Sequence, residues 1–385
     1  MQDHSEPQNP AVTLRAVVAV PARNEAARIA ACLSAFEGQV GVGSGAFGVL
    51  LLVNNASDGT AALARELSGR LPYPLRVSEI DLPPERAHAG WARRLAMDEA
   101  GSWLDEAGHA DGVILTTDAD SRVAADWVAT TLAAFDAGAD AVAGLVTLDA
   151  EEAARLPPAL RLRSALEDEY EGLLAELQAC LDPEVHDPWP RHAMASGASL
   201  AVTLGAYRSV GGLPPVPLGE DRALVAALLS RDARVRHPLD VRVVTSGRLD
   251  GRAAGGAADT LRARGQVPDE PCDEKLEPAV RAAARAICRA RLRRAWVGGT
   301  LAADGPWASR LGLPAARALE IAALPAFGQV WASVAASSPA LVARRLRPSD
   351  LLREIGEARR IIGLVRVIQA RGARDDQARV STSRR

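Results

Sequence analysis

Short apolar runs alternate with amphipathic stretches along the first part of the chain, up to about residue 150. These runs predict strands over 15–20, 49–53, 75–80, 113–116 and 141–146, and the β-rich run at 113–116 predicts a buried one. Between the first two runs, Ile29, Leu33 and Phe36 recur at helical spacing. Alternating strands and helices predict an α/β fold, with a mostly parallel, doubly wound sheet covered on both faces.

Polar loops follow three of these strands: PARNE at 21–25, NNASDGT at 54–60 and TTDADS at 116–121. Right-handed crossovers bring the carboxyl ends of neighbouring parallel strands to one rim of the sheet. Ligands of open α/β sheets bind at that rim, so three polar loops in succession predict a binding site there. Taken singly, each loop has a plainer explanation as a turn, a helix cap or a surface ion pair.

The last of these loops carries two carboxylates, Asp118 and Asp120. Residues i and i+2 of an extended segment point to the same side, so the two carboxylates converge. Their mutual repulsion favours a hard divalent cation, Mn²⁺ or Mg²⁺, which takes oxygen ligands and keeps places for phosphate oxygens. The alternative is an Asp-rich loop that only caps the helix beginning near Ala124.

The composition is that of an ordinary globular protein, with 48% hydrophobic and 24% charged residues among 385. The net charge of −3 gives no support to a nucleic-acid partner. The four cysteines form no C-x-x-C pair, which argues against a disulfide framework or a zinc site and fits a reducing, cytoplasmic location. Since the sequence has no run of about 18 uncharged apolar residues, we expect no transmembrane helix.

Four features of the sequence follow one another in order: P-x-R-N-E, N-N-A-S-D-G-T, an A-R-R segment at 92–94, and D-A-D at 118–120. This order resembles that of the GT-A glycosyltransferases, specifically the inverting family 2, over roughly residues 14–250. The resemblance implies a nucleotide-diphosphate-sugar donor at the rim of a Rossmann-like sheet, with a divalent metal beside it. By match of position, the donor-binding residues are Pro21, Ala22, Arg23, Glu25, Asn54, Arg93 and Asp118, and the metal ligand is Asp120.

Within this set, the resemblance gives each polar residue a role. Arg93 would make a charge-assisted contact with a phosphate. Asp118 would meet the ribose or a metal-bound water. Asn54 departs from the family, which usually has an Asp there that contacts the base, and an amide both donates and accepts. The identity of the base is therefore left open.

The resemblance also places a catalytic base in the acidic pair Glu220-Asp221, which opens a helix. This base would deprotonate the acceptor hydroxyl, and Asp221 is the first choice, with Glu220 second. A plainer interpretation is that the pair only complements the helix dipole.

Three further parts of the chain are candidates for the same site. His237 is expected either as a third metal ligand, as in several relatives, or as a structural histidine. Residues 245–248 with Arg252 would form an anion-binding loop that closes over the diphosphate, although Arg252 lies outside the residues that the structure describes. Residues 182–192 would form a lid or a wall of the acceptor site.

We therefore expect five segments along the chain. They are a disordered N-terminus over 1–13, a GT-A catalytic domain over 14–250, a flexible linker over 251–272, a helical region over 273–371 and a disordered tail over 372–385. Residues 274–294 carry seven basic and two acidic side chains, which is typical of a solvated helix face or of a helix in peripheral contact with a membrane.

The predicted function is transfer of a sugar, with inversion, to an acceptor hydroxyl. A sugar nucleotidyltransferase is a weaker alternative, because the glycine-rich loop and catalytic lysine typical of that class are missing near the first strand. A nucleotide-binding domain without turnover is a second alternative, against which the acidic pair at 220–221 argues. The sugar, the nucleotide, the acceptor and the oligomeric state are not indicated by the sequence.

Overall fold

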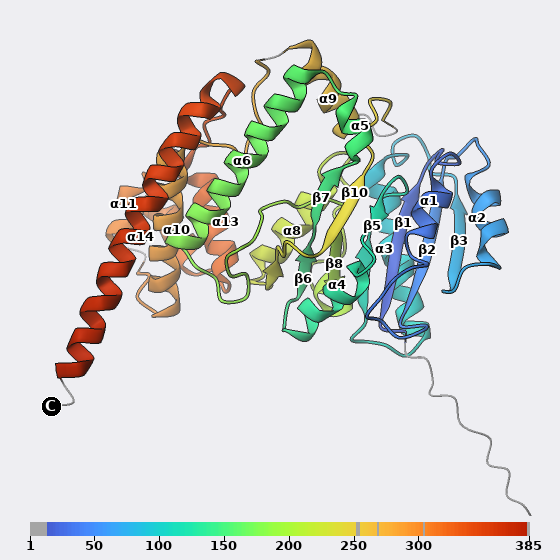
Figure 1. Ribbon diagram of the computed structural model, residues 1–385. Helices are drawn as coiled ribbons and strands as arrows, with labels where there is room; N and C mark the ends of the chain where they lie inside the picture. Colours follow the sequence, from blue (N-terminus) through green and yellow to red (C-terminus); the bar gives the residue numbers. More distant parts are fainter. Residues whose placement is uncertain (1–13, 252–254, 268, 303–304, 383–385) are drawn as a thin grey trace, which may run out of the picture.

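The computed structural model describes residues 14–251, 255–267, 269–302 and 305–382 (Figure 1). The N-terminal segment predicted to be disordered, 1–13, lies outside the described residues. A sheet occupies the N-terminal half, and a group of helices from the C-terminal part lies beyond α8 (Glu220–Ser230), at the end of the sheet far from β3 (Leu75–Ile80).

Seven strands form the main sheet in the order β3-β2-β1-β4-β8-β6-β9. Their bounds are β1 (Ala16–Ala22), β2 (Phe47–Asn54), β3, β4 (Val113–Thr116), β6 (Ala141–Ala143), β8 (Leu200–Thr203) and β9 (Val235–Arg236). Only β8 runs antiparallel to its neighbours, β4 and β6, so the predicted mostly parallel sheet is confirmed. The order places the ends of β2, β1 and β4 side by side, which brings the three polar loops to one rim.

Strand β1 is longer than predicted, because it continues through Pro21 and Ala22, which pair with Leu52 and Val53. The carbonyl of Ala19 accepts from Thr117 N on the β4 side, and in a parallel ladder Pro21 faces the same side. Since β4 has already ended there, the N–H that Pro21 lacks leaves no ladder bond unmade.

The two faces of β1 lead into two hydrophobic cores. Val18 and Val20 pack with residues of α1 (Ile29–Ser34), α2 (Thr60–Ser68) and α4 (Trp127–Asp136). Val17 and Ala19 pack with α3 (Ala89–Glu106), α7 (Leu204–Ser209) and α8 on the opposite face. This alternation is the double winding expected of a buried, mostly parallel sheet.

A small second sheet has the order β5-β10-β7, with β5 (Arg122–Val123), β10 (Arg242–Thr245) and β7 (Leu145–Leu148). Strand β10 is antiparallel to β5, with Val244 opposite Arg122. Because β5 follows the D-A-D turn directly, this pairing carries the segment after Thr245 to that turn. The Ser121 hydroxyl donates to Thr245 Oγ1 at 2.9 Å across the junction.

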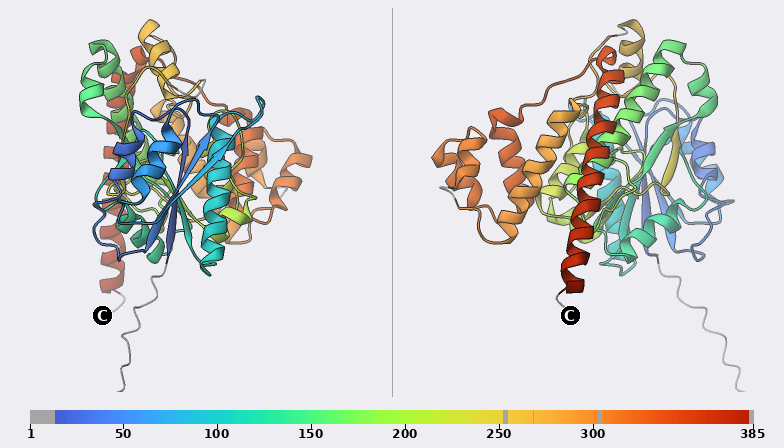
Figure 2. Two further views of the ribbon diagram at one scale, coloured as in Figure 1. Left: turned by 90° about the vertical axis from the view of Figure 1, so that its right-hand side faces the viewer. Right: turned by 60° about the vertical axis from the view of Figure 1, so that its left-hand side comes forward.

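Helices make up the rest of the described chain. They are α5 (Ala150–Ala154), α6 (Pro158–Leu181), α9 (Ala257–Gln266), α10 (Ala279–Val297), α11 (Pro306–Arg310), α12 (Ala315–Ala322), α13 (Phe327–Ser337) and α14 (Leu351–Thr382). The views in Figures 1 and 2 show α6, α10 and α14 side by side, and the three pack through shared apolar residues. No helix of the described residues has the length and apolarity to cross a membrane.

Two segments that were expected to be irregular contain helix. The predicted linker contains α9, whose Arg264 pairs with Glu167 of α6 at 2.8 Å and whose Ala258 is buried. The predicted disordered tail is helical up to Thr382, because α14 continues from the turns that pack on α6.

Candidate functional site

A buried guanidinium connects the D-A-D turn to the start of α8. Arg93, on α3, is 5% exposed. Its Nη2 lies 2.6 Å from Asp118 Oδ1, and its Nε lies 3.1 Å from Glu220 Oε1. Its Nη1 donates to Thr116 Oγ1 and to the carbonyl of Gly197, at 2.9 and 2.8 Å. Burial lowers the pKa of Arg93, but Asp118 and Glu220 outweigh that effect and raise it overall.

These contacts change the role expected for Arg93. Four of its five N–H donors are already directed at protein acceptors, so the side chain is committed to the scaffold and is not free to bind a phosphate. Arg93 instead connects Asp118 of the D-A-D turn to Glu220 at the start of α8 through two ion pairs.

The acidic pair divides between two environments. Glu220 is 7% exposed and its carboxylate is paired with Arg93. Asp221 is half-buried, and its Oδ2 accepts from the N–H of Gly197 at 2.9 Å. A side chain at residue 197 would meet the Arg93 guanidinium at 2.5 Å, so the glycine is required for this close approach. Of the two carboxylates, Asp221 is therefore the more accessible to a ligand.

On the other side of the D-A-D turn, Arg248 neutralises two acids. Its Nη1 and Nη2 contact the Glu25 carboxylate at 2.8 and 2.5 Å. The same Nη2 lies 3.0 Å from Asp120 Oδ2. Glu25, expected to line the nucleoside, is 5% exposed and engaged by this bidentate pair. Residues 245–248 therefore lie beside the D-A-D turn, where Arg248 contacts the carboxylates of Glu25 and Asp120.

Two further residues, Glu152 and Arg28, contact the 245–248 segment or each other, and no pattern in the sequence points to either. Glu152 Oε2 accepts from Ser246 Oγ and from Gly247 N, both at 2.7 Å, and Oε1 lies 2.9 Å from Arg28 Nη2. These bonds from Ser246, Arg28 and Gly247 hold the pKa of Glu152 below its ordinary value despite some burial. The contacts span 94 residues or more, so local patterns carry no trace of them.

The electrostatics at Asp120 fit a divalent cation. Burial and the neighbouring Asp118 raise the pKa of Asp120 to about 6, and Arg248 offsets only part of that rise. No group of three or more His, Cys, Asp or Glu side chains in the described chain is arranged to hold a metal. An ion here would therefore have the two carboxylates of the turn as protein ligands and would depend on ligand phosphates for others, which is usual for Mg²⁺.

The remaining donor-site candidates lie along the same rim. Pro21 and Ala22 end β1, and Asn54 ends β2, where it is 4% exposed and donates to Asn55 Oδ1 at 3.3 Å. Arg23 is half-buried and donates to the carbonyl of Ala87 at 3.3 Å. The long distance leaves most of its donor capacity for a ligand.

His237 is not brought to this rim. It follows β9, which is separated from β4 by β8 and β6, so about three strand spacings of ~4.8 Å intervene. Its Nδ1 lies 2.8 Å from Asp187 Oδ2, and its backbone N–H donates to the same carboxylate at 2.9 Å. The structure gives His237 a partner in the 182–192 segment, not a place beside Asp120.

Comparison with known proteins finds a family model that matches part of the chain. Residues 17–200 match the model of glycosyl transferase family 2, a span that runs from β1 to β8 and includes Arg93 and the D-A-D turn. A search of curated proteins finds no match.

Several solved structures are similar to this chain at low identity. TarS 1-349 of S. aureus, in complex with UDP-GlcNAc, is 14% identical with a TM-score of 0.45, over 77% of this chain and 80% of that one. Mannosyltransferase PcManGT from Pyrobaculum calidifontis, in complex with GDP-Man and Mn²⁺, is 19% identical with a TM-score of 0.43, over 84% and 85%. Glucosyl-3-phosphoglycerate synthase from Mycobacterium tuberculosis, in complex with Mn²⁺, UDP-Glc and phosphoglyceric acid, is 19% identical with a TM-score of 0.37, over 67% and 83%.

The buried position of Arg93 generates a first prediction. Arg93→Met removes the cation between two carboxylates and leaves Glu220 buried without a partner, so we expect the free energy of unfolding to fall by about 3–5 kcal/mol. Chemical denaturation at neutral pH measures this. The adjacent Arg94, whose pair with Asp98 is partly exposed, is the matched control, and Arg94→Met should cost about 1 kcal/mol or less. Equal losses for the two variants would contradict the assignment.

The raised pKa of Asp120 generates a second prediction. A carboxyl whose folded pKa lies above its unfolded value of 3.8 lowers stability above about pH 6, and that penalty disappears below about pH 4. Asp120→Asn should therefore raise the free energy of unfolding by on the order of 1–3 kcal/mol at pH 7.5, and by little at pH 4. Denaturation curves at both pH values check this. Asp136→Asn, in an exposed pair with Arg15, serves as control and should show no such pH-dependent gain.

Proposed function

We propose that this chain, whose residues 17–200 are a family 2 glycosyltransferase domain, transfers a sugar from a nucleotide-diphosphate-sugar donor to an acceptor hydroxyl with inversion and with the help of a divalent metal. The observation that supports it best is the Asp118–Arg93–Glu220 connection. It joins the carboxylate turn, suited to a diphosphate with its metal, to the helix that presents Asp221.

The nucleotide would lie across the ends of β1 and β2. Pro21 and Ala22 would form a wall for the nucleoside, Asn54 would meet the base, and Arg23 would contact the nucleotide through its spare donors. Asp118 keeps its second carboxylate oxygen for the ribose or for a metal-bound water, because Arg93 engages only Oδ1.

A divalent ion, Mn²⁺ or Mg²⁺, held by Asp120 with Asp118 beside it, would neutralise the charge that develops on the leaving diphosphate. In the structure, the positive charge beside the Asp120 carboxylate comes from Arg248. A guanidinium also matches the geometry of phosphate oxygens. Once an ion occupies Asp120, the same side chain can turn to the diphosphate while Glu152 retains the backbone of Gly247.

Asp221 would act as the general base. Its carboxylate accepts the proton of the acceptor hydroxyl as that oxygen bonds to the anomeric carbon, and the bond from this carbon to the donor phosphate breaks. The nucleoside diphosphate leaves with the bonding electron pair, and attack from the opposite face inverts the anomeric centre. Glu220 is less suited to this role because Arg93 holds its carboxylate in an ion pair.

The test of this function begins with a panel of nucleotide sugars, screened with Mn²⁺ by thermal unfolding, since a ligand that binds the folded state raises its midpoint. With the donor found, Asp221→Asn should keep the donor affinity and lower the transfer rate by roughly 10²–10⁴-fold, because the shape stays and the proton acceptor is lost. Calorimetry measures binding, and a rate assay of released nucleoside diphosphate measures turnover.

Glu220→Gln serves as the comparison for this variant. It weakens the pair with Arg93, so its main effect should be a lower free energy of unfolding. Near-normal transfer by Asp221→Asn would exclude Asp221 as the base. A chain that binds no nucleotide sugar, with or without Mn²⁺, would overturn the proposed function as a whole.

The contact between Arg248 and Asp120 generates a separate prediction about the metal. Arg248 and a divalent ion compete for the same carboxylate, so Arg248→Met should raise the affinity for Mn²⁺ in the absence of nucleotide, by roughly tenfold. Titration followed by the EPR signal of free Mn²⁺ measures this without any turnover. Arg122→Met, which removes an arginine paired with Asp149, is the control and should leave Mn²⁺ binding unchanged. Weaker binding by Arg248→Met would show that the two cations do not compete.

A further inference from the structure

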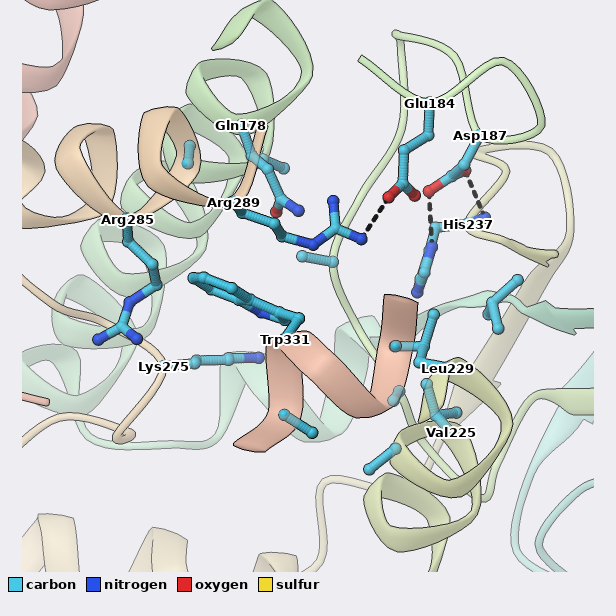
Figure 3. A pocket seen from close by; sticks show the side chains of 18 of the residues that line it. Gln178, Glu184, Asp187, Val225, Leu229, His237, Lys275, Arg285, Arg289 and Trp331 are labelled. Atoms are coloured by element: carbon cyan, nitrogen blue, oxygen red, sulfur yellow. Dashed lines mark hydrogen bonds and ion pairs between the residues drawn. The ribbon is translucent and has the colours of Figure 1, made fainter. Parts of the chain in front are cut away.

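A cavity of about 810 Å³ lies between the sheet domain and the C-terminal helices (Figure 3). Its walls come from α6, from the 182–195 segment, from α8, and from α10 and α13. That volume is in the range of small-molecule sites, which are usually ~300–1,000 Å³. The donor-site residues at the D-A-D turn do not line it.

Helix α8 connects this cavity to the proposed base. Asp221, Val225 and Leu229 are spaced by four residues and therefore share one face of the helix. Val225 and Leu229 line the cavity, as does Ala195, two residues before the glycine whose N–H donates to Asp221. The adjacent face, with Leu224 and Leu228, is buried against the sheet. The cavity thus begins one helical turn beyond Asp221.

Most of the charged groups around the cavity are paired with one another. Arg289 lies 2.5 Å from Glu184, Lys275 lies 2.7 Å from Glu171, and Arg285 lies 2.6 Å from Glu277. These pairs leave little uncompensated charge to attract an ionic ligand. Figure 3 shows the Trp331 ring pointing toward the side of the cavity that carries Arg285 and Arg289, while Val225 and Leu229 lie on another part of the wall. Apolar side chains thus provide much of the remaining surface.

Two further polar side chains, Gln178 and His237, face the same space. The side-chain amide of Gln178 makes no hydrogen bond within the described part of the chain, so it is free to donate and to accept. The ring of His237 reaches in beside Leu229 (Figure 3), and the Asp187 carboxylate accepts from its Nδ1. Its Nε2 is then left for a hydrogen bond with a hydroxyl group, which can both donate and accept.

We infer that this cavity binds the acceptor, and that the acceptor is an uncharged, largely apolar alcohol. Its hydroxyl would lie at Asp221, its hydrocarbon part would lie along Val225 and Leu229 toward Trp331, and any further hydroxyl would reach Gln178 or His237. The inference rests on the proposed function, because it takes Asp221 as the base. The hydroxyl proton passes to Asp221, and the new bond joins the alcohol oxygen to the anomeric carbon.

The test uses n-butanol, n-hexanol and n-octanol as acceptors, with the donor found by the panel. Burial of each added methylene predicts that kcat/KM for transfer rises about two- to fourfold per carbon in the natural chain. Leu229→Gln and Trp331→Ala should flatten this dependence and raise KM for octanol. Leu319→Gln, at an exposed leucine of α12 outside the cavity, should keep the full dependence.

The outcomes separate this inference from the proposed function. Failure of the natural chain to bind or hydrolyse any nucleotide sugar would remove the function itself. Donor hydrolysis with transfer rates that are independent of alcohol length would overturn only the acceptor class. A chain-length dependence that survives in both Leu229→Gln and Trp331→Ala would place the apolar acceptor site elsewhere.

Discussion

The site depends on one buried cation. Arg93 is charged, 5% exposed and surrounded by acceptors from β4, from the loop before β8 and from α8. Removing such a charge from water is costly, and only multiple well-placed partners offset the cost. The positions of Asp118, Gly197 and Glu220 are therefore coupled, because each satisfies part of the same guanidinium. Two carboxylates that would otherwise repel are held near each other before any ligand arrives.

On the other side of the D-A-D turn, the negative charge of Glu25 and Asp120 is balanced by a more exposed arginine. Arg248 lies between Glu25 and Asp120, but its side chain is 18% exposed and comes from a segment after the last strand of the small sheet. The raised pKa of Asp120 shows that this balance is incomplete. Arg93 is thus fixed within the scaffold, whereas we propose that Arg248 exchanges its carboxylates for a phosphate. The Arg93 network is therefore the preformed part of the site, and the Arg248 contacts are the part that we expect to change when a ligand binds.

Helix α8 links the two halves of the molecule. Its first turn meets the Arg93 network, one face packs on the sheet, and the next face lines the cavity bounded by α6, α10 and α13. The C-terminal helices therefore contribute directly to the surface next to the proposed base. Their own ion pairs, such as those of Arg289 and Arg293 with the fully buried Asp182 side chain, hold the 182–195 segment against them.

Patterns in the sequence were sufficient to predict the α/β alternation, the strand over 113–116 and the convergence of three polar loops on one rim. Each of these follows from periodicity or from turn and cap chemistry, which act over a few residues. Other contacts became visible only in the folded structure. Arg93 pairs with Asp118 and Glu220, Arg248 pairs with Glu25 at a separation of 223 positions, and His237 pairs with Asp187. A charged side chain could pair with any of many oppositely charged residues in the chain. Which pair forms depends on the burial and the distances that folding produces, so no local sequence pattern encodes it.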